Sequence, residues 1–384
     1  MAKGFDQVTV VYAGSTPIPS PIPTPPPIPT PENDIEFTIV HMDHAGNAVG
    51  EVTPNDVSGT IVLNDSGSVS YSIPLTSQMA IRAFSDPDLF DWMLVRNGVP
   101  LLAGPLESVS PDTDNKSFLP VTGKTWEGYL AERIMPWNPH ASNVDSQFKL
   151  YTDRDLLDIV RLLSDYVLGG PNSIPITYDP TDSGIITTQE FDPSSRDDLL
   201  SIIQGLAALQ PGFDFDIDVD CQMNFYTPHK GVISDLVLEL DANAIQISYT
   251  DNRIRGNRIS LQGSSSTGAT DIRVRDDLLS QAACRIRDVV DDIGTVASIP
   301  ELNRHANDEI VLAVQKQRDI VVRVDPQGSN YWEIAGVGDW IRVIGETPYE
   351  KLDDHFRCTQ IDFEFTTESK EFLTYTFSPS TFGI

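Results

Sequence analysis

Four aspartates in the segment GFDFDIDVDCQMNF have the spacing that most resembles a reactive site. Asp214, Asp216, Asp218 and Asp220 alternate there with apolar residues. Successive side chains of a strand point to opposite faces, so the alternation predicts one strand with all four carboxylates on one face. Such a row of oxygens could ligate calcium or supply the carboxylate pair of a glycoside hydrolase. In a chain this acidic, we favour the interpretation that it is the solvated face of an edge strand.

The histidines form no recognisable metal or catalytic motif. His41, Asp43 and His44 lie together in HMDH, but no third ligand follows at a metal-binding spacing. His305 lies in the apolar stripe of an expected helix, which favours a core or interface histidine. The sequence also lacks a Gly-x-Ser-x-Gly elbow, an HExxH motif and a phosphate-binding loop. We therefore predict no catalytic, cofactor-binding or metal-ligating residue, and we expect the protein not to be an enzyme.

The three cysteines are odd in number and far apart. Cys221, Cys284 and Cys358 each lie in an apolar-looking segment. This spacing excludes a disulfide framework and a zinc cluster, and it predicts buried thiols.

The chain is strongly acidic. It has 56 Asp and Glu against 26 Lys and Arg, a net charge of -30 and a pI of about 4.3. Non-specific nucleic-acid binding requires the opposite sign, so DNA is expected to be repelled. One explanation of the acidity is that the protein works in molar salt, where the Debye length falls to about 3 Å and the repulsion between the carboxylates is screened. Another is an acidic channel through which DNA slides without sticking. The acids are spread over the whole chain, which favours the first explanation, and both can hold.

The first part of the chain has the pattern of an antiparallel β-domain followed by a short helix. Residues 35–110 alternate short strand-like runs with turns, which is typical of a barrel or sandwich. The expected strands include Ile35–Met42, Gly59–Leu63, Val69–Ile73 and Ile81–Phe84. Trp92–Ser108 predicts a hairpin that turns at Asn97-Gly98, a dipeptide that tolerates positive φ angles. A short amphipathic helix follows in the segment GKTWEGYLAERIMPW, residues 123–137, and Pro136 and Pro139 end it.

The middle of the chain predicts an α/β unit, and the end returns to strands. Helices are expected over Asp153–Leu168, with Thr152 as N-cap, and over about 196–209, with Ser195 as N-cap. A strand-like run, Gly184–Thr188, separates them. Further on, two helices are expected at 276–290 and 301–317, after a strand pair within 245–261 and before four C-terminal strands.

The order of these elements resembles a family of viral tail proteins. The hairpin, the Gly104-Pro105 step, the next strand and the aromatic helix resemble the first β-domain of the minor tail proteins that form the baseplate hub of long-tailed, siphovirus-like viruses. The step Asn257-Arg258-Ile259 and the Gly-Asp-apolar strand entry at Gly338–Val343 are similar to later elements of that family. The resemblance implies a mixed, mainly β fold: two tail-tube-like antiparallel β-barrel domains, an α/β insert domain and accessory helices.

The resemblance also implies a domain division. We expect an N-terminal arm with a proline-rich linker at 1–34, a first tube-like β-domain at 35–139 and an α/β insert domain at 140–230. A second tube-like β-domain with two helices follows at 231–384, and strands from 240–262 could complete the first.

The N-terminal arm contains the segment STPIPSPIPTPPPIPTP, residues 15–31. Its prolines predict extended polyproline II of about 3.1 Å per residue. It is either a passive linker, which we favour, or an arm that lets Val8–Tyr12 add a strand to a neighbouring subunit.

The function that the resemblance implies is structural. It is that of a homotrimeric baseplate hub at the distal end of a virion tail, which adapts the six-fold tube to a three-fold tip and forms the channel for DNA. Expected partners are the distal tail protein or tail tube protein, the tape measure protein and tip or receptor-binding proteins, with DNA passing without specific binding. The acidity suggests a halophilic archaeal host.

Alternatives are a six-fold distal tail protein ring that carries receptor-binding proteins, and a tail-tip hydrolase that acts on a host surface polymer. The sequence has no signal peptide and no membrane-spanning run, so we expect synthesis in the host cytoplasm.

Overall fold

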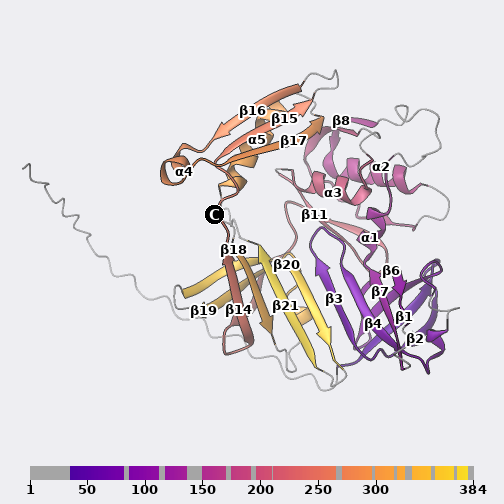
Figure 1. Ribbon diagram of the computed structural model, residues 1–384. Helices are drawn as coiled ribbons and strands as arrows, with labels where there is room; N and C mark the ends of the chain where they lie inside the picture. Colours follow the sequence, from indigo (N-terminus) through magenta and orange to yellow (C-terminus); the bar gives the residue numbers. More distant parts are fainter. Residues whose placement is uncertain are drawn as a thin grey trace, which may run out of the picture.

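The computed structural model describes most of the chain beyond the N-terminal arm. The described residues are 35–81, 86–111, 117–135, 149–169, 174–191, 196–209, 211–264, 270–295, 299–314, 318–324, 331–346, 351–366 and 370–378. The predicted arm and linker at 1–34 lie outside them. Figure 1 shows a broad sheet in the lower half of the molecule and two smaller units above it.

Seven strands from the first part of the chain form a run of antiparallel neighbours in the order β3-β4-β7-β6-β5-β1-β2. They are β1 (Phe37–Asp43), β2 (Ala48–Val52), β3 (Val57–Val62), β4 (Ser68–Pro74), β5 (Phe90–Arg96), β6 (Val99–Val109) and β7 (Phe118–Lys124). The predicted hairpin is confirmed. Between β5 and β6, Asn97 and Gly98 have φ angles of 50° and 79°, the positive values that a tight two-residue turn requires.

Six strands from the second half extend the same sheet. They are β13 (Ile233–Glu239), β14 (Ala244–Asp251), β18 (Arg318–Val324), β19 (Trp340–Glu346), β20 (Lys351–Phe365) and β21 (Glu371–Ser378). The long strand β20 pairs with β19, β21 and β3, where Phe363 lies opposite Gly59. Thirteen of the described strands thus form one sheet. The strand β14, within the 240–262 region, pairs with β18, and β20 is the strand that joins the two β-regions.

One hydrophobic core lies under this sheet and draws on both β-regions. Val69, Tyr71 and Ile73 of β4 are buried together with Tyr375 and Phe377 of β21. Burying each such side chain contributes about 1.5–3 kcal/mol. Because side chains alternate along a strand, the residues between these point to the opposite face of the sheet.

The predicted α/β unit packs around a second core. Its elements are β8 (Lys149–Asp155), α2 (Leu156–Leu168), β9 (Thr177–Tyr178), β10 (Ile186–Phe191), α3 (Leu199–Ala207), β11 (Asp214–Ile217) and β12 (Gln222–Tyr226), and α1 (Trp126–Ala131), which precedes the predicted unit, packs into the same core. Helix α2 buries Leu163 and Val167 against the same cluster that holds Trp126 of α1 and Ile203 of α3. Figure 1 places α2 and α3 above the strands of the first β-region.

A small three-stranded sheet forms the third unit. It consists of β15 (Arg258–Ser264), β16 (Thr270–Asp276) and β17 (Asp288–Thr295), in the order β16-β15-β17, with α4 (Leu278–Ala283) and α5 (Ile299–Ala313). Helix α5 packs Leu302 and Ala306 against Ile259 and Leu261 of β15. Two short helices, η1 (Gln78–Ala80) and α6 (Tyr331–Ile334), complete the described elements.

Helix starts differ from the prediction. Helix α2 begins at Leu156 with Asp155 as its N-cap, because β8 stays extended through Asp155 to pair with β10. Thr152 is therefore a strand residue. Helix α3 begins at Leu199 with Asp198 as N-cap, whereas the predicted cap, Ser195, lies outside the described residues.

The helix predicted at 276–290 is wrong over most of its length. Only α4 is helical, and Asp288 begins strand β17. Val289 lies opposite Ile259 in a parallel pairing, so a partner distant in sequence holds this segment extended. A strand predicted at Ile81–Phe84 is absent at Ile81, and residues 82–85 lie outside the described part of the chain.

The fold class predicted from the sequence, mixed and mainly β with an α/β insert and accessory helices, is confirmed. Among the helices described, none is long and apolar enough to cross a membrane.

Candidate functional site

The residues of the HMDH segment have separate partners. His41 is buried, and its Nε2 lies 2.9 Å from the Tyr71 hydroxyl. Asp43 accepts hydrogen bonds from the backbone of its own turn. His44 Nδ1 lies 3.2 Å from Asp91. Within the described residues, no three potential ligands come together in a metal-binding group.

The predicted row of four carboxylates does not form. Strand β11 ends at Ile217, and Asp218 and Asp220 lie in the turn that leads to β12, where Asp218 accepts backbone hydrogen bonds. Only Asp214 and Asp216 lie on the strand. The expectation of a solvated face is wrong for Asp214, which is buried.

The other residues singled out from the sequence are dispersed. Cys358 is buried as predicted, Cys221 is half-buried, and Cys284 is exposed, contrary to the prediction. His305 is half-buried on α5, beside the buried stripe that contains Leu302.

The outer face of the main sheet, opposite the hydrophobic core, is polar. A hollow of about 620 Å³ lies over this face. Short hydroxyl side chains from β3, β4, β7 and β21 line it, namely Ser58, Thr60, Ser68, Ser70, Thr122 and Thr374. We call this surface the hydroxyl face.

The carboxylates of the hydroxyl face are engaged with neighbours. Glu107 forms a 2.6 Å ion pair with Lys124. Asp362 accepts a 2.7 Å hydrogen bond from the Thr60 hydroxyl. Glu364 lies 3.9 Å from Arg323. Three carboxylates therefore lie against two cations, Arg323 and Lys124, so the face presents hydroxyls with a small excess of negative charge.

This chemistry suits a wetted surface that binds weakly. A surface that holds a polyanion requires unpaired Lys and Arg. The two cations at the hydroxyl face, Arg323 and Lys124, lie beside carboxylates, so the face offers water-like hydrogen bonds without electrostatic capture.

A buried polar junction fixes the sheet to the inserted domain. Asp214 of β11 accepts hydrogen bonds from Asn64 Nδ2 at 2.7 Å and from the Lys230 backbone N–H at 2.5 Å, and it forms an ion pair with Arg357 of β20. Asn64, at positive φ after β3, also accepts a 2.8 Å bond from the Phe215 N–H. One carboxylate thus ties together the turn after β3, the inserted domain and β20.

A second buried acid holds β11 from the side of α1. Glu127 Oε1 accepts a 2.7 Å hydrogen bond from the Ile217 N–H. Burial raises the pKa of Glu127, and the hydrogen bonds from Thr125 and Ile217 offset only part of that rise. Glu127 and Ile217 border a cleft of about 380 Å³ between the sheet and the inserted domain. In this cleft, Lys230 pairs with Asp216 at 2.5 Å.

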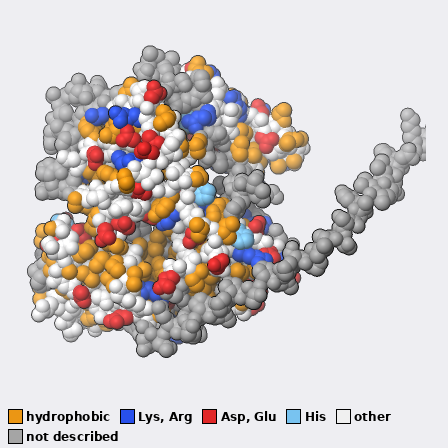
Figure 2. All heavy atoms as spheres, turned by 180° about the vertical axis from the view of Figure 1, so that it is seen from behind, with side chains coloured by type: hydrophobic (Ala, Val, Ile, Leu, Met, Phe, Trp, Pro, Cys, Tyr) orange, Lys and Arg blue, Asp and Glu red, His pale blue; other side chains and the backbone are white. Residues whose placement is uncertain are grey.

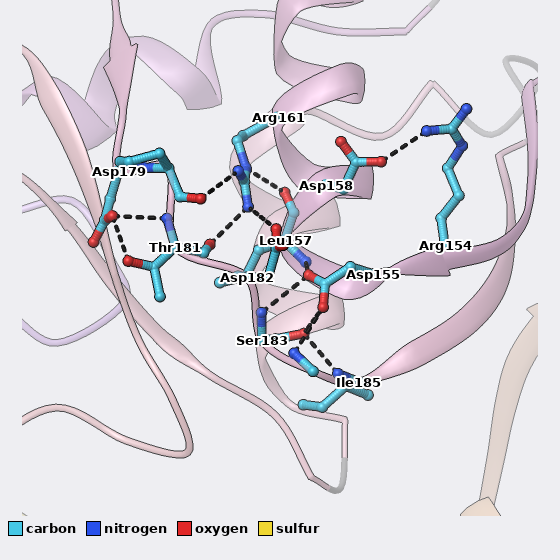
Figure 3. Close-up of polar contacts among 12 residues, drawn as sticks. Arg154, Asp155, Leu157, Asp158, Arg161, Asp179, Thr181, Asp182, Ser183 and Ile185 are labelled. Carbon is cyan, nitrogen blue, oxygen red and sulfur yellow. Dashed lines mark hydrogen bonds and ion pairs between the residues drawn. The ribbon is translucent and has the colours of Figure 1, made fainter.

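Hydrogen bonds join the loop after β9 to helix α2 of the inserted domain. Figure 3 shows Asp155, the N-cap of α2, also accepting hydrogen bonds from the Ser183 hydroxyl and from the backbone N–H groups of Ser183 and Gly184. Arg161 donates to the backbone oxygen of Thr181 at 2.7 Å. Partial burial opposes ionisation of Asp155, but these hydrogen bonds outweigh it and lower its pKa. The loop after β9 is thereby fastened to α2.

The hydroxyl face was not singled out from the sequence, although a signal was present. In SVSYSIP at 68–74 and LTYTFS at 373–378, hydroxyl residues alternate with apolar ones. Alternation assigns the hydroxyls to one face. That β4 and β21 belong to one sheet follows only from the long-range pairing of β20 with β3.

Comparisons with known proteins identify the fold. No protein-family model matches the chain, and no curated protein matches it. Among solved structures, the tail protein from Neisseria meningitidis MC58 aligns over 90% of this chain and 97% of its own, with a TM-score of 0.60 and 10% identity. The 43 kDa tail protein of prophage MuSo2 from Shewanella oneidensis aligns over 89% and 98%, with a TM-score of 0.60 and 14% identity.

A secretion-system component has a similar fold. The E. coli c3393 protein, a component of the type VI secretion system, aligns over 86% of this chain and 74% of its own, with a TM-score of 0.51 and 11% identity. Both tail proteins match over nearly their full length, so the likeness extends to the order of the units. This chain has the fold of phage tail proteins.

Proposed function

We propose that this protein is a structural component of a virion tail: a homotrimeric baseplate hub at its distal end. In this proposal, three copies form a ring, and the hydroxyl face of each main sheet lines a channel for DNA. The two β-regions of each chain correspond to two tube-like domains, so three chains offer six such units to a six-fold tube and a three-fold tip.

The observation that carries the proposal is the hydroxyl face. Duplex DNA carries one negative charge per roughly 1.7 Å of its axis, so a lysine-rich wall would hold it. An acidic wall would repel it. The cations of the hydroxyl face, Arg323 and Lys124, lie beside carboxylates, and its hydroxyls are neutral, so its lining offers no unpaired cation to hold DNA. Three of the 56 acids of the chain line this face, and acids elsewhere on the surface would hydrate it in molar salt.

The partners follow from this position. The ring would contact the distal tail protein or tail tube protein on one side and tip or receptor-binding proteins on the other, with the tape measure protein in the channel before DNA release. The role is mechanical and non-enzymatic, and the host is a halophilic archaeon.

The first test concerns assembly. Mass measurement and electron microscopy in 2–3 M salt are expected to give a trimer of about 127 kDa, three times 42.3 kDa, with a central hole. In about 0.15 M salt the trimer should dissociate or unfold, because the acidic surface loses its screening. A six-membered ring would instead indicate the distal tail protein. A monomer that is stable in both salts would refute the halophile assignment and leave ring formation dependent on partners.

The second test concerns the channel. Virions that carry S70K/T374K add two lysines to each hydroxyl face and should release DNA at least tenfold more slowly. The matched control is L150K/I186K, which adds two lysines at exposed positions of β8 and β10. If both variants release DNA at the wild-type rate, the hydroxyl face does not line the channel.

A further inference from the structure

Helix α4 has no packing partner in the part of the chain that the structure describes. None of its six residues is buried, and Leu278 and Leu279 are 73% and 85% exposed. Helices shorter than about 12–15 residues are marginal in water, and most helical stability in proteins comes from the packing of an apolar face. The apolar side chains of α4 therefore have the character of a contact surface whose partner is another molecule.

Hydrogen bonds hold α4 in this exposed position. The carboxylate of Asp277 caps the helix and accepts hydrogen bonds from its first turn. Gln281 donates at 2.7 Å to the backbone oxygen of Asn257, which is buried. The Asn257 side chain donates to the backbone oxygen of Arg285 at 3.2 Å and accepts from the Arg287 N–H at 2.8 Å. Figure 1 shows α4 projecting from the small sheet, away from the inserted domain.

Two arginines flank the apolar side chains of α4. Arg285 follows the helix, and the segment 253–257 runs beside it, since Arg287 donates to the backbone oxygen of Ile254 at 3.4 Å. Arg253 and Arg285 are exposed, and among the described residues neither guanidinium has a carboxylate partner. We call the surface formed by Leu278, Leu279, Arg253 and Arg285 the α4 knob. Figure 2 shows hydrophobic side chains gathered at the end of the molecule that α4 forms.

The aspartates near the α4 knob have other partners. Asp276 and Asp288 lie 2.7 Å and 3.7 Å from Arg258, which pairs with both. Asp277 is bound to the backbone of α4 itself. The two arginines of the knob therefore keep their charge for a partner, and the surface that fits them combines an apolar hollow with carboxylates at its rim.

This chain has such a hollow in the cleft of about 380 Å³ between the sheet and the inserted domain. Apolar side chains of the sheet and of α6 line it, among them Ile61, Leu63, Leu101, Leu102, Trp332 and Ile361. Its lining also includes Asp65, Asp216 and Asp218, with Lys230 as its one cation among the described residues. Lys230 pairs with Asp216, which leaves Asp65 and Asp218 without a cationic partner in the described part of the chain.

The α4 knob and the cleft match in size and in charge. A volume of about 380 Å³ is near the lower end of the range of about 300–1,000 Å³ for pockets that enclose a ligand, so the cleft admits a few side chains. Guanidinium groups form strong hydrogen bonds with carboxylates. In Figure 1, α4 lies apart from β3 and β11, which border the cleft, so a second copy must supply the knob.

We propose that the α4 knob of one copy docks in the cleft of a neighbouring copy. The two leucines then pack against the apolar lining, and the two arginines lie beside Asp65 and Asp218. The contact is head-to-tail, because the knob and the cleft are different surfaces, and repeated contacts of this kind close a ring or continue as a filament. Closure at three copies rests on the proposed function, whereas the docking does not.

The test is crosslinking between two populations of full-length chain. One population carries L279C and the other D65C, both with C284S to remove the exposed native thiol. Burial raises the pKa of Cys221 to about 12, and Cys358 is buried, so neither native thiol competes. The populations are mixed in high salt, allowed to exchange copies and treated with a short bis-maleimide.

The expected product is a crosslinked dimer of about 85 kDa, twice 42.3 kDa, in the L279C plus D65C mixture. The matched control mixes L279C with I186C, an exposed position on β10, and should give about tenfold less product. Equal yields in both mixtures, or no product in either, would overturn the docking.

Two further outcomes separate the occupants of the cleft. A crosslink that forms only within single chains of the L279C/D65C double variant would show that α4 folds onto its own cleft, which would overturn the second copy as partner. A dimer that forms in the L279C population alone, with the same yield, would show that two knobs face each other, and would overturn the cleft as their site.

A second measurement does not depend on crosslinking geometry. L278S/L279S on the knob and L101D in the cleft should each raise the concentration at which the copies dissociate by about tenfold or more, because each removes apolar contact. Combining them should add little, since both act on the same contact. The pair L150S/I186S, at exposed positions of β8 and β10, should leave that concentration unchanged.

The same measurement distinguishes the docking from the hub proposal. If L278S/L279S dissociates at the wild-type concentration, the docking is refuted, and a three-membered ring would still support the hub. If the copies dock through the α4 knob but form an open filament, the docking stands and the hub proposal fails.

Discussion

Removing the Asp214 carboxylate should weaken the joint between the sheet and the inserted domain. D214A leaves Arg357, the Lys230 N–H and Asn64 Nδ2 without the acceptor that they share. Hydrogen bonds to a charged group are worth about 1.5–3 kcal/mol each, and breaking a buried pair costs about 3–5 kcal/mol. Because the Arg357 side chain remains 21% exposed and can recruit water, we expect a loss near the lower end, about 3 kcal/mol.

The assay is urea unfolding in high salt, with hydrogen exchange to locate the loss. D214A should lower the unfolding midpoint and speed exchange in β11 and β20, and D214N should cost about half as much because it keeps an oxygen acceptor. The matched control is D182A, since Asp182 is 73% exposed. A midpoint for D214A equal to that of D182A would refute the reasoning. A double-mutant cycle of D214A and R357A that gives no coupling energy would also refute the reasoning.

Two buried acids, Glu371 and Glu127, and the half-buried Asp155 give further predictions. E371Q replaces the carboxylate that balances the buried Arg96 guanidinium with a neutral amide and should cost about 3 kcal/mol in urea unfolding, whereas the apolar pair R96M/E371L should restore most of it. E127Q keeps an acceptor for the Ile217 N–H and removes a carboxylate whose pKa burial raises. The stability that protonated Glu127 contributes is fully present below the pKa of the unfolded state, and it is lost as pH rises through the raised pKa of the folded state. Because a glutamine cannot ionise, the free energy of unfolding of E127Q should depend less on pH above pH 4.5 than that of the wild type, and at pH 7 it should match or exceed the wild-type value. A lower melting temperature for E127Q at pH 7 would contradict this. D155A should cost about 1–2 kcal/mol and expose the loop after β9 to proteolysis. The pKa of Asp155 is lowered, so the stability that its carboxylate contributes should persist at neutral pH and disappear as pH falls below about 3.8. A difference in stability between D155A and the wild type that stays the same in acid would contradict this.

Local patterns in the sequence were sufficient for much of the secondary structure. The dipeptide Asn97-Gly98 fixed a hairpin because few residues accept two successive positive φ angles. The apolar spacing of α2 and α3 located both helices, since one face of each had to be buried. The helix starts were misplaced because the pairing of β8 with β10 decided how far the extended backbone continued.

Long-range contacts decided what local patterns left open. The segment 276–290 has apolar residues that suit a helix, yet pairing with β15 makes its end a strand. The aspartates at 214–220 alternate as a strand face would, yet β11 stops at Ile217 and the partners of Asp214 come from residues as distant as Arg357. The spacing of residues in the sequence indicates neither the pairing of β17 with β15 nor the partners of Asp214.

By itself, the sequence determined the charge of this protein, its mainly β character, its hairpin and its principal helices, because composition and periodicity act over a few neighbouring residues. The tertiary structure alone decided that both β-regions share one sheet through β20, and so that hydroxyl residues from four strands meet on one face. It also decided that Asp214 is buried at the junction with β20, whereas Asp218 and Asp220 of the same acidic run lie in a turn. The physical reason is that strand order and burial depend on contacts between segments up to about three hundred residues apart, whose energies no local pattern contains.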